Sequence, residues 1–409
     1  MFKIGIIRES RTDDKRTPLV PKNVKSLLNK FNNTKIIVQP SETRCFSNDE
    51  YEKESAVIDE NLSECDIILG VKEIEPDRLI PNKTYIFFSH TAKIQEDNSA
   101  VAQGTPGMDK KKLLNEIQSK NITLIDYENI RDNLSRRYLG FGRFAGIVGC
   151  YNSLNLYLLK TNQEPMPRAY ELDSYEKLIE NIKKKNFKNL KILVTGDGRV
   201  AKGVLEFLKL TNLKNITPKE CVSANNLSSY YCNLPTAKYV ISKDNKQFDL
   251  QHFIRFPNLY KSQLSSYMQN INLLISSHYW DPKSPKLFEK KDLFNFKKLE
   301  VIGDITCDIN GSIPTTIRST TIKDPYFYLN IETFKEVEKN YNDLAIMAVD
   351  NLPSELPKDS SEEFGNGIVN HVLPYIIQQD DGRIKKATIT HNGKFLPSYN
   401  YIRDYINKK

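Results

Sequence analysis

The sequence predicts an α/β protein built on parallel sheets, and three observations support this fold class. Short apolar runs alternate with helical patterns along most of the chain, as in successive strand–helix–strand units. A glycine-rich turn at 196–201 stands directly between such a run and such a pattern. The 409 residues are enough for two or three domains with cores of their own.

The first 130 residues contain five apolar runs that we interpret as strands. They lie at 2–7, 34–40, 65–74, 83–90 and 122–128, with amphipathic helical patterns at 23–31 and 110–120. In parallel sheets, ligands bind outside the carboxyl ends of the strands. Polar side chains follow three of these runs: Lys72 with Glu73, His90, and Asp126 with Glu128. Their position alone makes them candidate site residues.

The second part of the chain repeats this pattern. A long helix is expected over 143–160, and buried strands within 191–195, 270–280 and 299–304. Polar residues again follow the strands: Ser277, His278 and Tyr279 after one, and Asp304, Thr306 and Asp308 after another. We interpret His278 as structural. From about residue 330 the pattern is read as helical, over 332–352 and 361–377.

The segment Gly196-Asp197-Gly198-Arg199-Val200-Ala201 fits the dinucleotide-binding pattern G-x-G-x-x-A. Gly196 would form the tight turn, and Gly198 would let a pyrophosphate approach the backbone. Ala201 would keep helix and strand close, while the helix start at Arg199 and Val200 would offer unpaired N–H groups to phosphate. The alternative is a tight turn in an unrelated α/β sheet.

The choice between NAD and NADP stays open. NAD-binding units usually carry an acidic residue about 20 residues farther on, at the end of the second strand. Here the corresponding segment holds Thr217 and Lys219, and Glu220 falls where we expect a helix to start. A lysine in this place would suit the 2′-phosphate of NADP.

Composition disfavours several other classes of protein. The net charge of +8 comes from dispersed lysines, and the aromatic residues follow strand and helix patterns, so no nucleic-acid partner is expected. No apolar run reaches the length of about 18 residues needed to span a membrane, and the start does not resemble a signal peptide. The cysteines and histidines lack metal-site spacing, so we expect no metal, reduced thiols and a cytoplasmic location.

Six segments appear in an order that resembles a known family: GVKEI, FFSHTAKIQ, SRRYLGFGRFAG, VTGDGRVAKG, DITCDINGSIP and AVDNLPSELPKDSSEEFG. Together they resemble the alanine dehydrogenase/transhydrogenase amino-terminal superfamily. Within it they are most similar to the saccharopine-forming branch of lysine metabolism, which contains saccharopine dehydrogenase (L-lysine-forming) and lysine-2-oxoglutarate reductase. The stretches 94–112 and 217–250 depart from the family pattern.

The resemblance implies two Rossmann-like domains with parallel sheets and an active cleft between them. A discontinuous substrate and catalytic domain would comprise 1–150 plus 331–409. A dinucleotide-binding domain would comprise 151–330. Whether the chain is a monomer or a homodimer stays open.

The resemblance also implies an NAD(P)-dependent oxidoreductase that condenses L-lysine reductively with 2-oxoglutarate to saccharopine, or catalyses the reverse. In the family pattern, Lys72 and His90 are the acid–base groups. Lysine suits this task only if burial or a neighbouring cation lowers its pKa. Glu73 would either oppose that shift or orient the site. The alternatives are a surface Lys–Glu pair and a hydrogen-bonded loop histidine.

The remaining roles are likewise implied by the resemblance. On the substrate side they fall to Arg16, Glu73, Glu128, Arg137 and Phe141. On the cofactor side they fall to Gln95, Arg136, Gly196, Gly198, Arg199, Val200, Ala201, Tyr279, Asp304, Thr306 and Asp308. The alternative for residues 136 and 137 is a solvent-exposed arginine pair.

Two other functions remain as alternatives. One is an alanine-dehydrogenase-like oxidoreductase acting on a small amino acid, and the other is a non-catalytic NAD(P)-binding sensor. Arg16, Arg137 and Lys72 together favour a substrate with several carboxylates. The presence of both Lys72 and His90 argues against a sensor.

Overall fold

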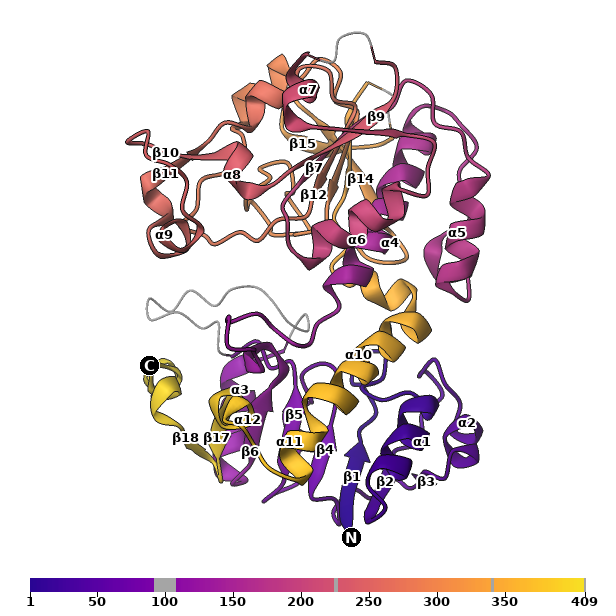
Figure 1. Ribbon diagram of the computed structural model, residues 1–409, viewed down its shortest axis with the longest axis vertical. Coiled ribbons are helices and arrows are strands. Elements are labelled where there is room, and N and C mark those ends of the chain that lie inside the picture. The colour runs from indigo at the N-terminus through magenta and orange to yellow at the C-terminus, as the bar shows by residue number, and fades with distance from the viewer. Residues whose placement is uncertain (92–107, 224–226, 340–341, 408–409) are drawn as a thin grey trace. The chain divides into compact units, whose positions relative to one another are not determined.

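The computed structural model describes residues 1–91, 108–223, 227–339 and 342–407. The chain divides into two compact units, which Figure 1 colours along the sequence. Unit 1 comprises Met1–Phe141 and Pro357–Lys409, and unit 2 comprises Gly142–Leu356. The boundaries predicted from the sequence, near 150 and 330, differ from these. Helix α4 (Gly142–Lys160) and the three strands between residues 326 and 347 belong to unit 2.

Unit 1 contains an eight-stranded sheet in the order β18-β17-β6-β5-β4-β1-β2-β3. The strands are β1 (Phe2–Ile6), β2 (Thr34–Val38), β3 (Val57–Ile58), β4 (Ile67–Leu69), β5 (Thr84–Phe87), β6 (Thr123–Asp126), β17 (Thr388–His391) and β18 (Lys394–Phe395). The first six are parallel, as predicted, and β17 joins the edge of β6 antiparallel. The last segment of the chain therefore completes the sheet that the first segment begins.

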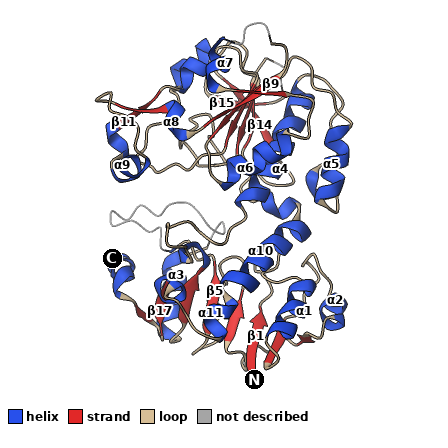
Figure 2. Ribbon diagram, viewed as in Figure 1, coloured by secondary structure: helices blue, strands red, loops and turns tan. Residues whose placement is uncertain are grey.

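Helices cover both faces of this sheet (Figure 2). They are α1 (Pro21–Lys30), α2 (Asn48–Lys53), α3 (Lys110–Ser119), α10 (Pro357–His371), α11 (Leu373–Ile377), α12 (Arg383–Ala387) and α13 (Asn400–Asn407). Ile67 and Leu69 pack in one core with α1 and α10, while Ile68 between them packs in another with α3 and α13. This alternation is what a strand buried on both faces requires.

Unit 2 contains a second eight-stranded sheet, in the order β15-β14-β16-β13-β12-β7-β9-β8. The strands are β7 (Lys191–Thr195), β8 (Lys214–Ile216), β9 (Tyr230–Leu234), β12 (Leu273–Ser276), β13 (Val301–Asp304), β14 (Tyr326–Asn330), β15 (Lys335–Val337) and β16 (Leu344–Met347). Only β14 runs against the other strands of this sheet, because it pairs antiparallel with both β15 and β16. A separate two-stranded sheet pairs β10 (Val240–Ser242) with β11 (Tyr260–Ser262).

The prediction of helix over 332–352 was wrong, because this segment contains β15 and β16. The apolar run Leu344–Met347 lies beside β13 and is buried on both faces. Periodicity alone does not separate such a short buried run from part of a helix. The helix predicted farther on, over 361–377, is confirmed by α10 and α11.

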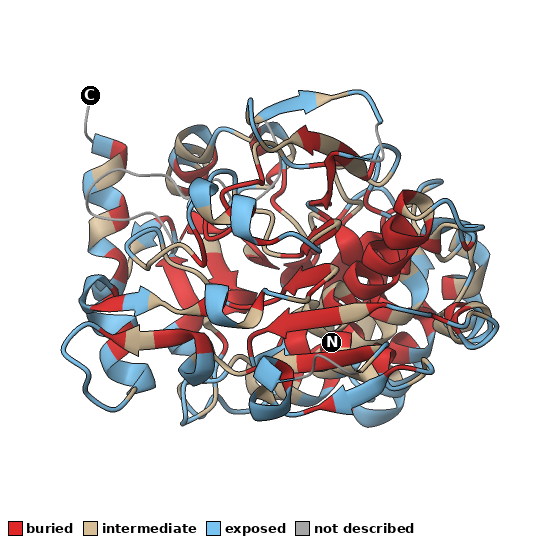
Figure 3. Cartoon of the chain, turned by 90° about the horizontal axis from the view of Figure 1, so that it is seen from above, coloured by how far each residue is buried: buried red, intermediate tan, exposed pale blue. Residues whose placement is uncertain are grey.

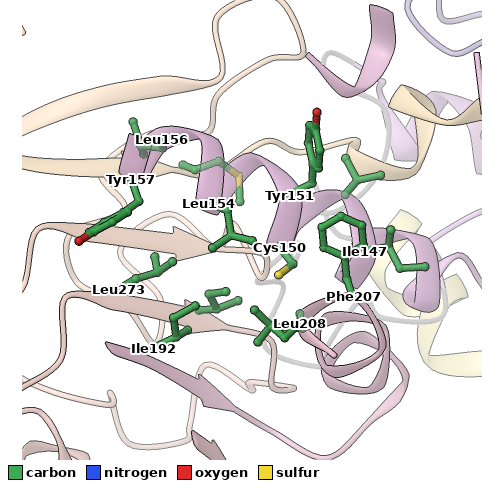
Figure 4. Close-up of a cluster of buried hydrophobic side chains, with 14 of the residues drawn as sticks. Ile147, Cys150, Tyr151, Leu154, Leu156, Tyr157, Ile192, Phe207, Leu208 and Leu273 are labelled. Atoms are coloured by element: carbon green, nitrogen blue, oxygen red, sulfur yellow. The ribbon is translucent and has the colours of Figure 1, made fainter. Parts of the chain in front are cut away.

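The helices of unit 2 are α4, α5 (Tyr175–Lys183), α6 (Arg199–Leu208), α7 (Pro218–Ser223), α8 (Thr236–Tyr239) and α9 (Leu250–Arg255). Helix α4 is almost wholly buried, and its apolar side chains pack on β7, β12 and α6 (Figures 3 and 4). Gly146 of α4 and Gly203 of α6 allow the two backbones to touch. A Cβ atom on Gly146 would lie 2.1 Å from the carbonyl oxygen of Val200.

Short 3-10 turns join these elements. They are η1 (Pro76–Arg78), η3 (Tyr127–Asn129), η4 (Ala169–Glu171), η5 (Pro257–Leu259), η6 (Leu264–Tyr267), η7 (Lys290–Asn295), η8 (Leu352–Glu355) and η9 (Pro397–Tyr399). Among the helices of the described residues, none combines the length and the apolar character that crossing a membrane demands.

Candidate active site

Glu73 and His90 form a buried pair at the carboxyl ends of the neighbouring strands β4 and β5. The Glu73 Oε1 atom lies 2.7 Å from Nδ1 of His90. Burial by itself would raise the pKa of Glu73, but the hydrogen bond with His90 and the charges of His90 and Lys72 outweigh it and lower that pKa to about 2. The carboxylate is thus ionised at neutral pH and orients the imidazole.

The backbone of His90 is also unusual. Its φ is +52°, in the left-handed region that side-chain-bearing residues seldom adopt. Phe88 stacks beside the imidazole at 6.2 Å between ring centres. Strained backbone of this kind is held by its surroundings and gathers at functional sites.

Lys72 precedes Glu73 and is partly buried. Burial lowers the pKa of its amine, and the nearby charge of Arg16 lowers it further, while Glu73 and Asp14 act in the opposite sense. The net direction is the one that a lysine acting as a base requires. A simple surface Lys–Glu pair is therefore not what the structure contains.

Arg16 lies on the loop after β1 and is almost completely buried. Its guanidinium donates from Nε and a terminal nitrogen to the two oxygens of Asp14, at 2.8 and 2.5 Å. It also lies over the ring of Phe141, 4.2 Å from the ring centre. Burial opposes ionisation of Asp14, but Arg16 outweighs it and lowers the pKa of that carboxyl. Sequence reasoning missed Asp14, although an acid two residues before the arginine was a usable signal.

A second group contains Glu128 and Arg137, whose Oε1 and terminal nitrogen are 3.2 Å apart. Asp126 connects it to the first group. Its carboxylate accepts hydrogen bonds from the backbone and hydroxyl of Ser89, which precedes His90. Burial and the charge of Glu128 raise the pKa of Asp126, while the charge of His90 lowers it.

Two predicted residues of unit 1 stand outside these groups. The Arg136 side chain is 71% exposed and pairs with Asp132 at 2.8 Å. For Arg136, this exposure fits the alternative given in the sequence analysis, a solvent-exposed arginine pair. Gln95 lies outside the described residues.

In unit 2, the predicted glycine turn joins β7 to α6. Gly196 has a φ of +102°, and Gly198 is the N-cap of α6, whose first turn contains Arg199 and Val200. Ala201 is completely buried against the core. The turn at Gly196, the start of the helix at Arg199 and the close packing at Ala201 are thus as the sequence predicts.

Gly198 provides the test of whether this turn suits a dinucleotide. Its φ of −80° is open to any residue, and, apart from Gly198 and its two chain neighbours, no protein atom lies within 4 Å of the position that a Cβ would occupy. Neither the backbone nor the packing therefore demands glycine here. The bare backbone faces open space beside the amino end of a helix, which is where a phosphate group fits.

The strand beside the glycine turn is not the one that the sequence indicated. The segment before Thr217 and Lys219 forms β8 at the edge of the sheet, and β9 lies between it and β7. The backbone N–H of Gly196 donates to the carbonyl of Leu234, the last residue of β9. The strand next to β7 was thus misassigned, because chain order does not give strand order when a later strand inserts between two others.

The polar residues after β12 and β13 differ in their exposure. Asp304 is completely buried, and its two oxygens accept hydrogen bonds from the hydroxyls of Thr306 and Thr316, both at 2.6 Å. Its carboxylate therefore orders the strand exit. Thr306 and Asp308 are partly exposed, and Tyr279 is 74% exposed.

His278 behaves as a structural residue. It is buried, and its Nδ1 lies 2.9 Å from the hydroxyl of Thr195. Burial lowers its pKa to about 4, so the ring is neutral at physiological pH. It packs directly under Gly196, where an added Cβ would approach the His278 backbone to 3.0 Å.

Models of two domains of one protein family match the chain. The model of the alanine dehydrogenase/PNT N-terminal domain matches residues 5–148, and that of the alanine dehydrogenase/PNT C-terminal domain matches 236–398. The chain belongs to the alanine dehydrogenase/PNT family. This confirms the resemblance drawn from the sequence motifs and places the chain in a family of oxidoreductases.

Several known proteins are similar to this chain in sequence. Alpha-aminoadipic semialdehyde synthase of Arabidopsis thaliana is 29% identical, and the match covers 98% of this chain and 41% of the relative. The mitochondrial alpha-aminoadipic semialdehyde synthase of Bos taurus is also 29% identical, over 95% of this chain and 46% of the relative. The chain thus spans less than half of each. Saccharopine dehydrogenase [NAD(+), L-lysine-forming] of Emericella nidulans is 23% identical, over 93% of this chain and 92% of the relative.

Solved structures share the fold. An L-alanine dehydrogenase superposes with a TM-score of 0.65 at 13% identity, covering 99% of this chain and 100% of the other. A transhydrogenase from Sinorhizobium meliloti gives 0.58 at 14% identity, covering 96% and 98%. The predicted α/β class with two Rossmann-like, mostly parallel sheets is confirmed.

Proposed function

We propose that this protein is an NAD(P)-dependent oxidoreductase that joins L-lysine to 2-oxoglutarate, giving saccharopine, or catalyses the reverse. The observation that carries the proposal is the group in unit 1 where Lys72 adjoins the Glu73–His90 pair and the buried Arg16. The named activity of the saccharopine dehydrogenase relative supports the choice of substrates.

A proton is transferred at each step of this reaction. The side-chain amine of lysine attacks the keto carbon, water leaves to give an imine, and reduction of the imine with one further proton gives saccharopine. Lys72, with its lowered pKa, takes the proton from the attacking amine. His90, oriented by Glu73, exchanges the proton of the departing oxygen. Well-placed groups of this kind contribute roughly 10²- to 10⁴-fold each.

Arginines hold the carboxylates of the substrates. Arg16 is rigid, because Asp14 and Phe141 fix its plane, and Arg137 is fixed by Glu128. Guanidinium groups remain charged and bind carboxylates through two parallel hydrogen bonds. We assign Glu128 to the amino group of the lysine substrate, since it is an anion placed beside Arg137.

The dinucleotide binds at Gly196–Ala201 in this proposal, with its pyrophosphate at the amino end of α6. When bound, the reduced nicotinamide supplies the hydride. The remaining cofactor assignments are Gln95, Arg136, Tyr279, Asp304, Thr306 and Asp308. Asp304 holds Thr306 in place by accepting hydrogen bonds from its backbone and its hydroxyl. We leave NADH and NADPH as the two arms of the test, because neither β8 nor β9 is followed closely by the acidic residue typical of NAD sites.

The test is oxidation of NADH and of NADPH, followed by absorbance, with 2-oxoglutarate and a panel of amino acids. The expected result is oxidation with lysine and formation of saccharopine. Oxidation with pyruvate and ammonia instead would establish the alanine-dehydrogenase-like alternative. Dinucleotide binding without oxidation of either nucleotide would indicate a sensor.

We further propose a cytoplasmic protein that is a monomer or a homodimer. No disulfide joins the six cysteines, all of which lie in the described residues, and this is consistent with a reducing compartment. Cell fractionation and light scattering test these two points, and recovery in mitochondria would overturn the first.

A further inference from the structure

Glu9 lies on the loop after β1, and its carboxylate binds the segment that carries Lys72. One oxygen accepts the backbone N–H of Val71 at 2.7 Å, and the other accepts the backbone N–H of Lys72 at 2.9 Å. Neither the acid–base roles nor the substrate roles described above use this side chain.

These two bonds continue the sheet beyond its last strand pairs. At the end of β4, Gly70 donates to the carbonyl of Ile86, and the carbonyl of Leu69 accepts from Ile7. Beyond that point the backbone N–H groups of Val71 and Lys72 have the Glu9 carboxylate as their partner in place of a backbone carbonyl. Glu9 therefore fixes the direction in which the chain leaves β4.

We propose that Glu9 is a positioning residue that holds the Lys72 backbone so that the Lys72 amine stays in its buried place beside Arg16. The proposal rests on the function proposed above only for the importance of that amine. The positioning of the Lys72 backbone by Glu9 does not depend on which substrate the protein binds.

The charges around Lys72 and Glu9 determine the direction in which the pKa of Lys72 should change when Glu9 is replaced. The Lys72 amine is subject to Arg16 and Arg11, which lower its pKa, and to Glu73 and Asp14, which raise it. Glu9 itself is subject to Asp14 and Arg16, and burial raises its pKa to about 7. Removing the Glu9 anion would directly lower the pKa of Lys72, because an anion favours the ammonium form. Releasing Lys72 from its buried position would raise that pKa toward the ordinary 10.5.

The experiment measures the pH dependence of Lys72 acetylation by isotope-coded acetic anhydride, quantified by mass spectrometry, in the full chain without substrate. Only the neutral amine reacts, so the midpoint reports the pKa. In Glu9→Ala we expect the midpoint to rise by about one pH unit or more. In Glu9→Gln, which keeps one carbonyl acceptor, we expect a smaller rise. An unchanged or lower midpoint in the variants would overturn the proposal.

Asp249→Ala is the matched control. Asp249 also accepts a backbone N–H, that of His252 at 2.6 Å, but it does so in unit 2. This change should leave the Lys72 midpoint as it is. If Glu9→Ala does not fold, Glu9→Gln carries the test. If saccharopine is not formed but the midpoint rises, the proposed function fails while the positioning role stands.

Discussion

Glu73 and His90 lie 2.7 Å apart although they are 17 positions apart in the sequence, because β4 and β5 are parallel neighbours that end at the same edge. The residue before Glu73 is Lys72. A single strand end thus contributes both an amine and the carboxylate that orients an imidazole from the next strand.

Lys72→Met and His90→Ala should each lower kcat about 10²- to 10⁴-fold, because each removes a proton-transfer group. Affinity for the dinucleotide should change little, since the glycine turn belongs to unit 2. Steady-state kinetics and titration of NAD(P)H fluorescence measure the two quantities. A loss of dinucleotide affinity with kcat unchanged would contradict the assigned roles.

Gly198→Val should abolish dinucleotide binding while leaving the fold intact. The valine side chain enters space that no protein atom occupies, and the backbone angle suits it. Binding is measured by calorimetry and folding by the thermal midpoint. Ser265→Val, at an exposed position of unit 2, should leave both as in the wild type. Normal binding by Gly198→Val would remove the glycine turn from the site.

Arg137→Ala should raise KM for 2-oxoglutarate by about 10-fold or more, as expected for loss of a charged hydrogen bond. Arg136→Ala is the natural comparison, because this neighbour is exposed and paired with Asp132. The Arg136→Ala change should leave KM for 2-oxoglutarate unchanged and weaken only the binding of the dinucleotide. Equal effects of the two changes on 2-oxoglutarate would show that the arginines act as one surface pair.

Glu355→Gln should change how stability depends on pH. Burial raises the pKa of Glu355 from 4.5 to about 7, with Arg168 opposing it. Between these values the folded protein holds a proton that the unfolded chain has released, so the free energy of unfolding falls as pH rises through this interval. The glutamine does not titrate, and its carbonyl can still accept from the Asn152 amide, which donates to Glu355 at 2.7 Å.

Between pH 4 and pH 8, the free energy of unfolding of the variant should therefore rise by about 3 kcal/mol relative to that of the wild type. Urea unfolding at the two pH values measures this difference. Glu9 titrates in both proteins, so its contribution to the pH dependence of stability cancels in the comparison. An equal loss of stability with pH in the two proteins would show that Glu355 does not titrate in this range.

Local signals in the sequence were sufficient for much of the fold. Parallel strands were predicted from apolar runs with polar residues at their ends, and Lys72, Glu73 and His90 were placed together by that rule. The order of β8 and β9 was not predictable in this way, because strand neighbours are chosen by packing rather than by chain order. The strand Leu344–Met347 was missed since its apolar run carries no period.

Contacts made at a distance were also beyond sequence reasoning. Nothing in the spacing of Glu9 indicated that its carboxylate accepts two backbone N–H groups more than 60 residues away. Likewise, the burial of Asp304 and the exposure of Arg136 depend on loops whose course only the folded chain defines.

The antiparallel attachment of β17 to β6 has a consequence for synthesis on the ribosome. Unit 2 is one continuous stretch and is complete once Leu356 has emerged, whereas the edge of β6 stays uncovered until Thr388–His391 follows. Nascent chains should therefore acquire protease resistance in the middle of the sequence before they acquire it at the beginning.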